Sequence, residues 1–271
     1  MLKEILENVR AKTPLVHNIT NYVTVNDCAN ILLACGASPI MADDLEEVED
    51  ITSICSGLNI NIGTLNKMTI SAMLAAGKKS NELNHPIVLD PVGAGASRLR
   101  ADTAKKLLET VKFSVIRGNL SEIKCLAVGS SKTRGVDSVD SINKENIDSL
   151  VSFAKDFAQK TSSIIVITSV IDIVTDGKIA YCVYNGDKIM SRITGSGCQL
   201  SAMMAAYISA NTDNILKAAL ACVCAMGLCG EIAKNRMTDK DGNSSYRNYL
   251  IDAVYNLTSD ELEKGARYEI R

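Results

Sequence analysis

The chain has 271 residues, enough for one large α/β domain or two small ones. Its hydrophobic fraction of 46% and charged fraction of 22% are typical of a globular protein. A net charge of −2 provides no basic field for nucleic acid or an anionic membrane, and an aromatic content of 4% without Trp disfavours a base-stacking platform. The composition therefore indicates a globular protein that binds neither nucleic acid nor membrane.

Short apolar runs alternate with longer helical patterns along the chain. The pattern predicts strands at 39–41, 58–62, 87–89, 114–117, 163–168, 172–175 and 179–184. It predicts helices at 24–35, 66–81, 101–111, 121–127, 143–159, 198–210 and 213–235. This alternation is typical of an α/β fold with a mainly parallel sheet that helices cover on both faces. The turn at Asp176-Gly177 predicts an antiparallel strand at one edge.

The cysteines and the first residues bear on the cellular compartment. Nine cysteines show no Cys-x-x-Cys spacing and the chain has only two histidines, so we expect no zinc site. Residues 1–10 have the pattern of a short amphipathic helix rather than a signal peptide, and no apolar run approaches a membrane span. These features predict a cytoplasmic protein whose cysteines act mostly as small core residues.

The helix at 213–235 is small and apolar around most of its circumference. We therefore expect it to be deeply buried. Cys222, Cys224 and Cys229 would then be core residues.

The most informative segment is 192–201, which reads Arg-Ile-Thr-Gly-Ser-Gly-Cys-Gln-Leu-Ser. It predicts a strand end, a tight turn from Thr194 to Gly197, and a helix that opens at Cys198. Unpaired N–H groups at a helix start, reached through glycines, suit a phosphoryl group, and the same environment favours a thiolate. The alternative is an ordinary tight turn that carries a buried cysteine, and this segment alone does not decide between them.

Polar residues directly follow several predicted strands, where ligands bind in parallel sheets. Asp90 follows 87–89 and either holds Mg²⁺, orients a hydroxyl, or caps the next turn. Arg117 ends the next strand and is suited to clamping a phosphate. Thr168 ends another strand, where it would touch a nucleotide phosphate.

Two readings are open for Glu122. It lies three residues after Asn119, which is the spacing of a helix capping box. The functional alternative is that Glu122 organises Mg²⁺-bound waters and phosphate. Any use of ATP must be of a non-P-loop kind, because Gly77-Lys-Lys-Ser80 lacks the earlier glycine of that motif and Ala72 stands in its place.

Several short segments occur together in a specific order and spacing. They are Val16-His-Asn-Ile-Thr-Asn-Tyr-Val-Thr-Val-Asn26, Ala37-Ser-Pro-Ile-Met-Ala42, Leu58-Asn-Ile-Asn-Ile-Gly-Thr-Leu65, Asp90-Pro-Val-Gly-Ala-Gly-Ala96, Arg117-Gly-Asn119 with Glu122, and Thr194-Gly-Ser-Gly-Cys198. Together they resemble the hydroxyethylthiazole kinase family, thiamine-salvage enzymes of the ribokinase-like superfamily. Most ribokinase-like kinases carry aspartate where Cys198 stands, and cysteine is the variant associated with this family.

This resemblance implies a single ribokinase-like domain over residues 1–271, built as a three-layer sandwich. It implies phosphorylation of the primary alcohol of 4-methyl-5-(2-hydroxyethyl)thiazole by ATP with Mg²⁺. It also implies a homotrimer with active sites between subunits. Asn21 and Met41 lie far from Cys198 along the chain, so we expect a neighbouring subunit to cover the site.

The resemblance also implies a role for each residue of the site. The expected set is Cys198 for catalysis, Asn21, Met41 and Gly195 for substrate, Arg117, Thr168 and Thr194 for ATP, and Asp90 and Glu122 for Mg²⁺. Cys198 would orient or deprotonate the alcohol. A free thiol has a pKa of ~8.5, so it needs the helix N-terminus to act as a base near neutral pH. Phosphoryl transfer has a loose transition state, so little base strength is required.

Two other classes of function are compatible with the fold. One is another ribokinase-like activity, such as a hydroxymethylpyrimidine kinase or an ADP-forming hydro-lyase of nicotinamide repair. The cysteine at 198 and the segment from Asn18 to Asn26 argue against both. The other is a non-catalytic binding regulator on the same fold. Asp90, Glu122 and Cys198 together disfavour it, since binding alone needs neither metal nor base.

Overall fold

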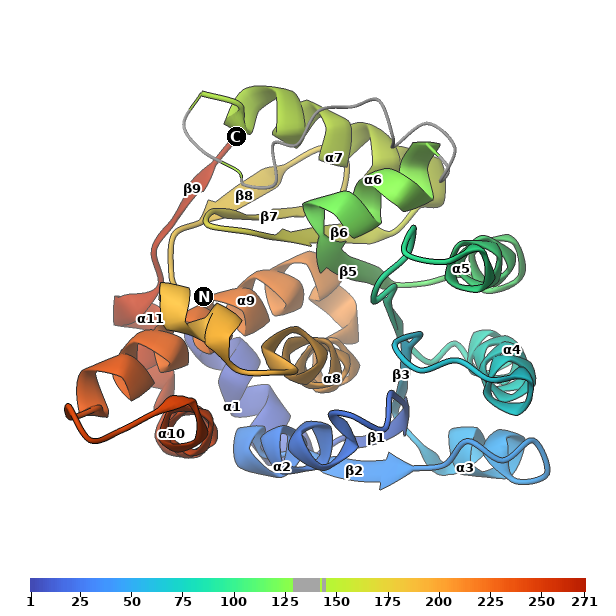
Figure 1. Cartoon of the computed structure of the whole chain (residues 1–271), viewed down its shortest axis with the longest axis horizontal. Coiled ribbons are helices and arrows are strands. Elements are labelled where there is room, and N and C mark those ends of the chain that lie inside the picture. The colour runs from blue at the N-terminus through green and yellow to red at the C-terminus, as the bar shows by residue number, and fades with distance from the viewer. Residues whose placement is uncertain (129–141, 143–144) are drawn as a thin grey trace.

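The computed structural model describes residues 1–128, 142 and 145–271, and it shows a twisted sheet between two layers of helices (Figure 1). Within the described residues, nine strands form one sheet in the order β2-β1-β3-β4-β5-β6-β7-β8-β9. The strands are β1 (Leu15–Ile19), β2 (Ser38–Met41), β3 (Gly57–Asn61), β4 (Ile87–Asp90), β5 (Val115–Asn119), β6 (Ile164–Thr168), β7 (Asp172–Thr175), β8 (Ala180–Val183) and β9 (Tyr268–Ile270).

The sheet is parallel from β2 to β6, and the three remaining strands are antiparallel to their neighbours. The predicted mainly parallel sheet with an antiparallel edge is therefore confirmed. The sequence pattern missed β1, because His17 and Asn18 interrupt its apolar run. His17 is nevertheless buried, with its Nδ1 3.0 Å from Thr52 Oγ1 and its Nε2 2.8 Å from the Ala42 carbonyl oxygen. Burial lowers the pKa of His17, so this ring is neutral at neutral pH.

The helices divide between the two faces of the sheet (Figure 1). One layer contains α1 (Leu2–Lys12), α2 (Val25–Cys35), α8 (Ser196–Ala210), α9 (Ile215–Arg236), α10 (Asn243–Asn256) and α11 (Ser259–Gly265). The other contains α3 (Val48–Ile54), α4 (Lys67–Glu82), α5 (Arg98–Thr110), α6 (Leu120–Val128) and α7 (Ile147–Thr161). Each face of the sheet has its own hydrophobic core, which confirms the predicted three-layer α/β sandwich.

Several helices differ from the sequence prediction. Residues 143 and 144 of the predicted helix 143–159 lie outside the described residues, and α7 itself begins at Ile147. The pattern missed α3, α10 and α11. In α10 the buried residues are Tyr246, Leu250, Ala253 and Val254, which have helical spacing. The pattern missed this helix because its first turn is polar.

The helix α9 is long and mostly apolar. With the short 3₁₀ turn before it, it forms the segment Thr212–Arg236, which is long enough to cross a membrane and contains an 18-residue window with a mean hydropathy of 1.8. This corrects the expectation that no apolar run approaches that length. The structure buries 67% of this window inside the protein, so its apolar character is that of a core helix. Cys222, Cys224 and Cys229 are fully buried core residues, as predicted, and all nine cysteines are free thiols.

Candidate active site

The carboxyl ends of the parallel strands bring a group of buried polar side chains together around the amide of Asn61. The strand register places Asn61 of β3 opposite Asp90 of β4. Asn61 Nδ2 donates to Asp90 Oδ2 at 2.8 Å and to Cys198 Sγ at 3.2 Å. Asn61 Oδ1 accepts from Asn21 Nδ2 at 3.0 Å and from the Gly63 backbone N–H at 2.9 Å. A single amide thus connects Asn21, Asp90 and Cys198.

Cys198 lies in the first turn of α8 and receives two amide hydrogen bonds. Its Sγ accepts from Asn21 Nδ2 and from Asn61 Nδ2, each at 3.2 Å. Burial and the neighbouring Asp90 carboxylate raise the pKa of Cys198, and the hydrogen bonds from Thr24 and the two amides do not offset that rise. Cys198 is therefore a thiol near neutral pH, and the expectation that the helix start favours a thiolate is wrong for this environment.

The turn before Cys198 also differs from the sequence prediction. The helix begins at Ser196 rather than at 198, and a 3₁₀ turn at Lys188–Arg192 precedes it instead of a strand end. The side chain of Asp187 caps that 3₁₀ turn by accepting from the Ile189 N–H at 2.9 Å, which favours a helical turn over an extended strand.

Neighbouring side chains leave no room for a Cβ at either glycine of this turn. Gly195 has φ +83°, and a Cβ there would lie 2.4 Å from Thr24 Cγ2. A Cβ on Gly197 would lie 2.6 Å from Arg117 Nη1. The second contact places a guanidinium against the start of α8, where backbone N–H groups lack intrahelical partners. This arrangement favours an anion site over an ordinary tight turn.

Asp90 is a fully buried carboxylate beside Arg117. Burial raises its pKa to about 6, the Arg117 guanidinium opposes that rise, and the carboxylate of Glu122 adds to it. Among the described residues, Asp90 Oδ1 has no hydrogen-bond partner and lies 3.6 Å from Arg117 Nη1. Because its other oxygen bonds Asn61, Asp90 does not cap the following turn, and that alternative is excluded for the described residues.

Arg117 and Thr168 form a pair on neighbouring strands. Arg117 Nη2 donates to Thr168 Oγ1 at 2.7 Å, and the Arg117 side chain is only 10% exposed. The Nε of Arg117 has no partner within the described part of the chain. A buried guanidinium with an unused donor is suited to bind a phosphate.

Glu122 fulfils the predicted capping role. Its backbone N–H donates to Asn119 Oδ1 at 2.9 Å, and its Oε2 accepts from the Asn119 N–H at 2.8 Å. Its Oε1 accepts from the Gly93 N–H at 2.8 Å, which ties the loop after Asp90 to the start of α6. Each carboxylate oxygen therefore already accepts one backbone hydrogen bond.

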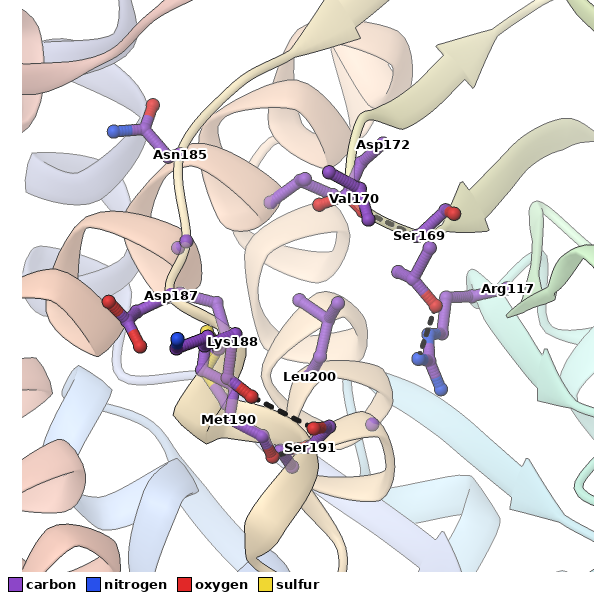
Figure 2. Close-up of a pocket in the computed structure, with 17 residues that line it drawn as sticks. Arg117, Ser169, Val170, Asp172, Asn185, Asp187, Lys188, Met190, Ser191 and Leu200 are labelled. Carbon is purple, nitrogen blue, oxygen red and sulfur yellow. Dashed lines mark hydrogen bonds between the residues drawn. The ribbon is translucent and has the colours of Figure 1, made fainter. Parts of the chain in front are cut away.

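A cavity of about 520 Å³ adjoins this cluster (Figure 2). Arg117, Thr168, Ser196 and Gly197 form its polar end. Leu200, Val223 and Met226 provide apolar lining, and the side chain of Val170 is exposed at its rim. The volume and the mixed lining are typical of a small-molecule site of nucleotide size.

The remaining expected site residues lie in different places. Asn21 contacts Cys198 within the same subunit, although the two residues are far apart along the chain. Gly195 is the N-cap of α8. Met41 is half-buried on the edge strand β2, three strands from Asp90 in the sheet order. Thr194 is exposed and is not among the residues that line the cavity.

Asn61 is the site residue that the sequence reasoning missed. It lies in an apolar run and reads as an ordinary strand residue. The available signal was its place at the carboxyl end of that run, one strand from Asp90. A primary amide buried there must find partners for both its donors and its acceptor.

The guanidinium at a helix start, the buried carboxylate and the cavity lie on a three-layer α/β fold that known small-molecule kinases share. The fold is similar to that of the pyridoxal kinase from Staphylococcus aureus in complex with ADP, with a TM-score of 0.62, 14% identity, and coverage of 95% of this chain and 97% of that one.

Closer similarities identify the family. The sequence matches the profile of the hydroxyethylthiazole kinase family (HK) over residues 6–260. It is 65% identical to the hydroxyethylthiazole kinase of Clostridium acetobutylicum over 271 residues, which cover 99% of each chain. The structure is also similar to that of the hydroxyethylthiazole kinase protein from Pyrococcus horikoshii OT3, with a TM-score of 0.89, 32% identity, and coverage of 100% of this chain and 98% of that one. The chain belongs to the hydroxyethylthiazole kinase family.

Proposed function

We propose that the protein transfers the γ-phosphoryl group of ATP to the primary alcohol of 4-methyl-5-(2-hydroxyethyl)thiazole, a step of thiamine salvage. The observation that carries the proposal is the cluster of Asn21, Asn61, Asp90 and Cys198 in a chain of this family. Its Asp90 lies 3.6 Å from Arg117, which lines the polar end of a nucleotide-sized cavity. The cavity takes ATP, and the cluster receives the thiazole alcohol.

ATP would lie with its phosphates toward Arg117 and the start of α8. Arg117 and the first N–H groups of α8 stabilise the charge on the transferring group, and Thr168 orients the guanidinium. The bond between the alcohol oxygen and γ-phosphorus forms as the bond to the bridging oxygen of ADP breaks, and the alcohol proton passes late to a water molecule. We also assign Thr194, which is exposed, to ATP and Gly195, the N-cap of α8, to the substrate and the transferring phosphate.

Cys198 would orient the alcohol rather than attack phosphorus. Its thiol accepts hydrogen bonds from two amides, and its raised pKa argues against a thiolate nucleophile. A direct in-line transfer needs no covalent enzyme intermediate. Asp90, whose pKa is about 6, is the ionised carboxylate of the cluster above that pH.

Mg²⁺ fits the carboxylates at this site. Mg²⁺ keeps several waters and usually takes only one or two carboxylates besides phosphate oxygens. Asp90 Oδ1, which has no hydrogen-bond partner in the described ranges, would bind it directly. Glu122, whose oxygens each accept a backbone N–H, would reach it through water. When bound, the ion neutralises charge on the triphosphate.

The quaternary arrangement is a further part of the proposal. We infer a homotrimer in which Met41 of one subunit contacts the thiazole bound by the next. Its support is that Met41 lies at the carboxyl end of the edge strand β2, where a neighbouring subunit can approach it. Tyr22, Leu45 and Met68 are also exposed apolar side chains on segments that follow β1, β2 and β3.

The proposed domain organisation rests on the sheet, and the proposed cellular compartment rests on the cysteines. One continuous sheet through the described residues supports a single kinase domain over residues 1–271. Nine free, buried cysteines support a reducing compartment, and we propose the cytoplasm.

The proposal is tested by ADP formation with Mg²⁺-ATP and one alcohol at a time. The hydroxyethylthiazole is expected to stimulate ADP release far more than hydroxymethylpyrimidine or pyridoxal. Turnover of another alcohol with the thiazole left unphosphorylated would favour a different ribokinase-like activity. Binding of the thiazole without ADP release would favour a regulator.

A further inference from the structure

One wall of the cavity is a short segment without strand or α-helix structure. This wall, residues 185–188, consists of the last three residues of the link between β8 and the 3₁₀ turn, together with Lys188, the first residue of that turn. Asn185, Gly186, Asp187 and Lys188 all line the cavity. Figure 2 shows this wall on the side of the cavity opposite Arg117, with the Asn185 amide turned away from the other lining residues. An irregular segment keeps its shape only if contacts outside the segment hold it.

Glu231 of α9 holds this wall from behind. Its Oε1 accepts from the Gly186 backbone N–H at 2.6 Å and from Asn185 Nδ2 at 3.5 Å. Burial raises the pKa of Glu231, but the hydrogen bonds from Arg267 and Gly186 outweigh it and lower the pKa overall. Glu231 is therefore ionised at neutral pH.

Arg267, between α11 and β9, completes the connection. It forms a two-point ion pair with Glu231, at 2.6 Å from Nη2 to Oε1 and 2.9 Å from Nη1 to Oε2. Its Nη2 also donates to the Tyr184 carbonyl oxygen at 3.1 Å, directly before the wall. Such planar two-point contacts fix the orientation of the two side chains as well as the distance between them.

The side chain of Asn185 ties the wall to the backbone of the same C-terminal segment. Its Oδ1 accepts from the Arg267 backbone N–H at 2.7 Å, and its Nδ2 donates to the Gly265 carbonyl oxygen at 3.0 Å. A Cβ on Gly227 of α9 would lie 2.7 Å from the Asn185 backbone, so the wall rests directly on α9. The wall is thus held between α9 and residues 265–267.

We propose that Arg267 and Glu231 are positioning residues for the nucleotide: their ion pair, with Asn185, fixes the 185–188 wall and thereby sets nucleotide affinity. Arg267 is not among the residues that line the cavity, so it acts on the nucleotide through the wall. This inference rests on the assignment of the cavity to ATP under the proposed function. Because the Arg267 side chain is 52% exposed, the pair adds little to global stability and its main effect is local.

The test compares Arg267→Ala with Arg271→Ala as a matched control. Arg271 lies at the far end of β9 and pairs with Asp148 and Glu269, away from the cavity lining. Calorimetry with ADP alone measures nucleotide affinity without the thiazole. We expect Arg267→Ala to raise the Kd for ADP and the KM for ATP about tenfold, the size of one lost charge-assisted contact. The kcat and the KM for the thiazole should stay within about twofold.

Two further variants keep the test decisive. Arg267→Lys should recover only part of the affinity, because an ammonium cannot make the planar two-point contact. Glu231→Gln keeps an oxygen for the Gly186 N–H but loses the charge, so it should weaken ADP binding even if Arg267→Ala does not fold. Arg271→Ala should leave the Kd for ADP unchanged.

Several results would overturn the inference. They are an unchanged Kd in folded Arg267→Ala and Glu231→Gln proteins, an equal shift in Arg271→Ala, or a wild-type protein that binds no ADP. If the wild type binds ADP and the Arg267 and Glu231 variants weaken it while the thiazole is never phosphorylated, the proposed function fails and this inference stands.

Discussion

At the scale of single residues, the site depends on polar groups that are costly to bury. Asn61 satisfies two donors and one acceptor with partners that include Asn21, Asp90 and Cys198. Burying an amide without such partners costs about 1–3 kcal/mol, so its hydrogen bonds stabilise the fold and orient the site together. Asp90 shows the opposite balance, since its raised pKa means that the folded protein disfavours its charge.

Asp90→Asn should therefore change stability in a pH-dependent way. The pKa of Asp90 rises from 3.8 to about 6 on folding, so the folded state binds the proton more tightly. Wild-type stability then falls as the pH rises between these values, by up to about 3 kcal/mol, whereas the neutral amide has no such dependence. Urea unfolding from pH 4 to pH 7.5 should show the stability difference moving in favour of the variant. A difference that is constant with pH would contradict this account.

Asn61→Leu should lose activity more than stability alone explains. The change removes the amide from Asn21, Asp90 and Cys198, and displacement of reacting groups by about 1 Å can cost about 100-fold in kcat. Asn59→Leu is the matched control, because Asn59 is equally buried in β3 but donates only to Asn18 Oδ1. Both should unfold at lower urea concentration, but only Asn61→Leu should lose kcat. Equal kcat values in the two folded variants would reduce Asn61 to a structural residue.

These residues differ in how far the sequence could predict them. Asp90 ends β4 and Cys198 follows a glycine turn, where position alone indicates chemistry. Arg117 was expected to end its strand, but β5 continues to Asn119 and Arg117 lies within it. Asn61 required the strand register, which the sequence does not contain. The protonation state of Cys198 could be predicted only once its burial was known. The position at a helix start alone predicts a lowered pKa, whereas burial raises the pKa of this thiol.

At the scale of elements, the contact between α8 and β5 organises the phosphate end of the cavity. Gly197 lets the guanidinium of Arg117 lie against the first turn of α8, while Thr168 on β6 holds its other side. The sequence predicted these elements within a few residues, because apolar periodicity and glycines mark them. It missed β1, where buried His17 and Asn18 break the apolar pattern. It also predicted a strand end at Arg192, where the structure has the end of a 3₁₀ turn.

Gly197→Ala tests this contact. A Cβ there would lie 2.6 Å from Arg117 Nη1 and would displace the guanidinium. We expect the KM for ATP to rise about tenfold, the cost of one misplaced charge-assisted contact. Thermal stability should hold or rise slightly, because alanine forms helix better than glycine. Gly242→Ala, where no atom lies within 4 Å of the added Cβ, is the control, and an equal KM in both variants would contradict the role of the contact.

At the scale of the whole molecule, the three-layer fold was predictable because strand and helix periods alternate clearly. The position of β9 at the far edge of the sheet could not be predicted, because this strand is only three residues long. The positions of the expected substrate residues in space could also not be predicted from the sequence. Asn21 meets Cys198 within one subunit, whereas Met41 stands on the opposite edge strand.

The proposed trimer predicts complementation between Met41 and Cys198 variants. If Met41 serves the neighbouring site, an equal mixture of Met41→Ala and Cys198→Ala subunits should form about one quarter intact sites. Activity should return after subunit exchange. Mixing Asn21→Ala with Cys198→Ala should restore nothing, because those residues share one subunit. No recovery in demonstrably mixed Met41 and Cys198 trimers, or a fully active monomer, would exclude shared sites.

The most direct test of the central claim is mass spectrometry of both products from one reaction with Mg²⁺-ATP and hydroxyethylthiazole. The account predicts ADP and the thiazole monophosphate in equal amounts from the wild type, and neither at a comparable rate from Asp90→Asn. ADP release with the thiazole unchanged, or an Asp90→Asn protein as active as the wild type, would contradict it.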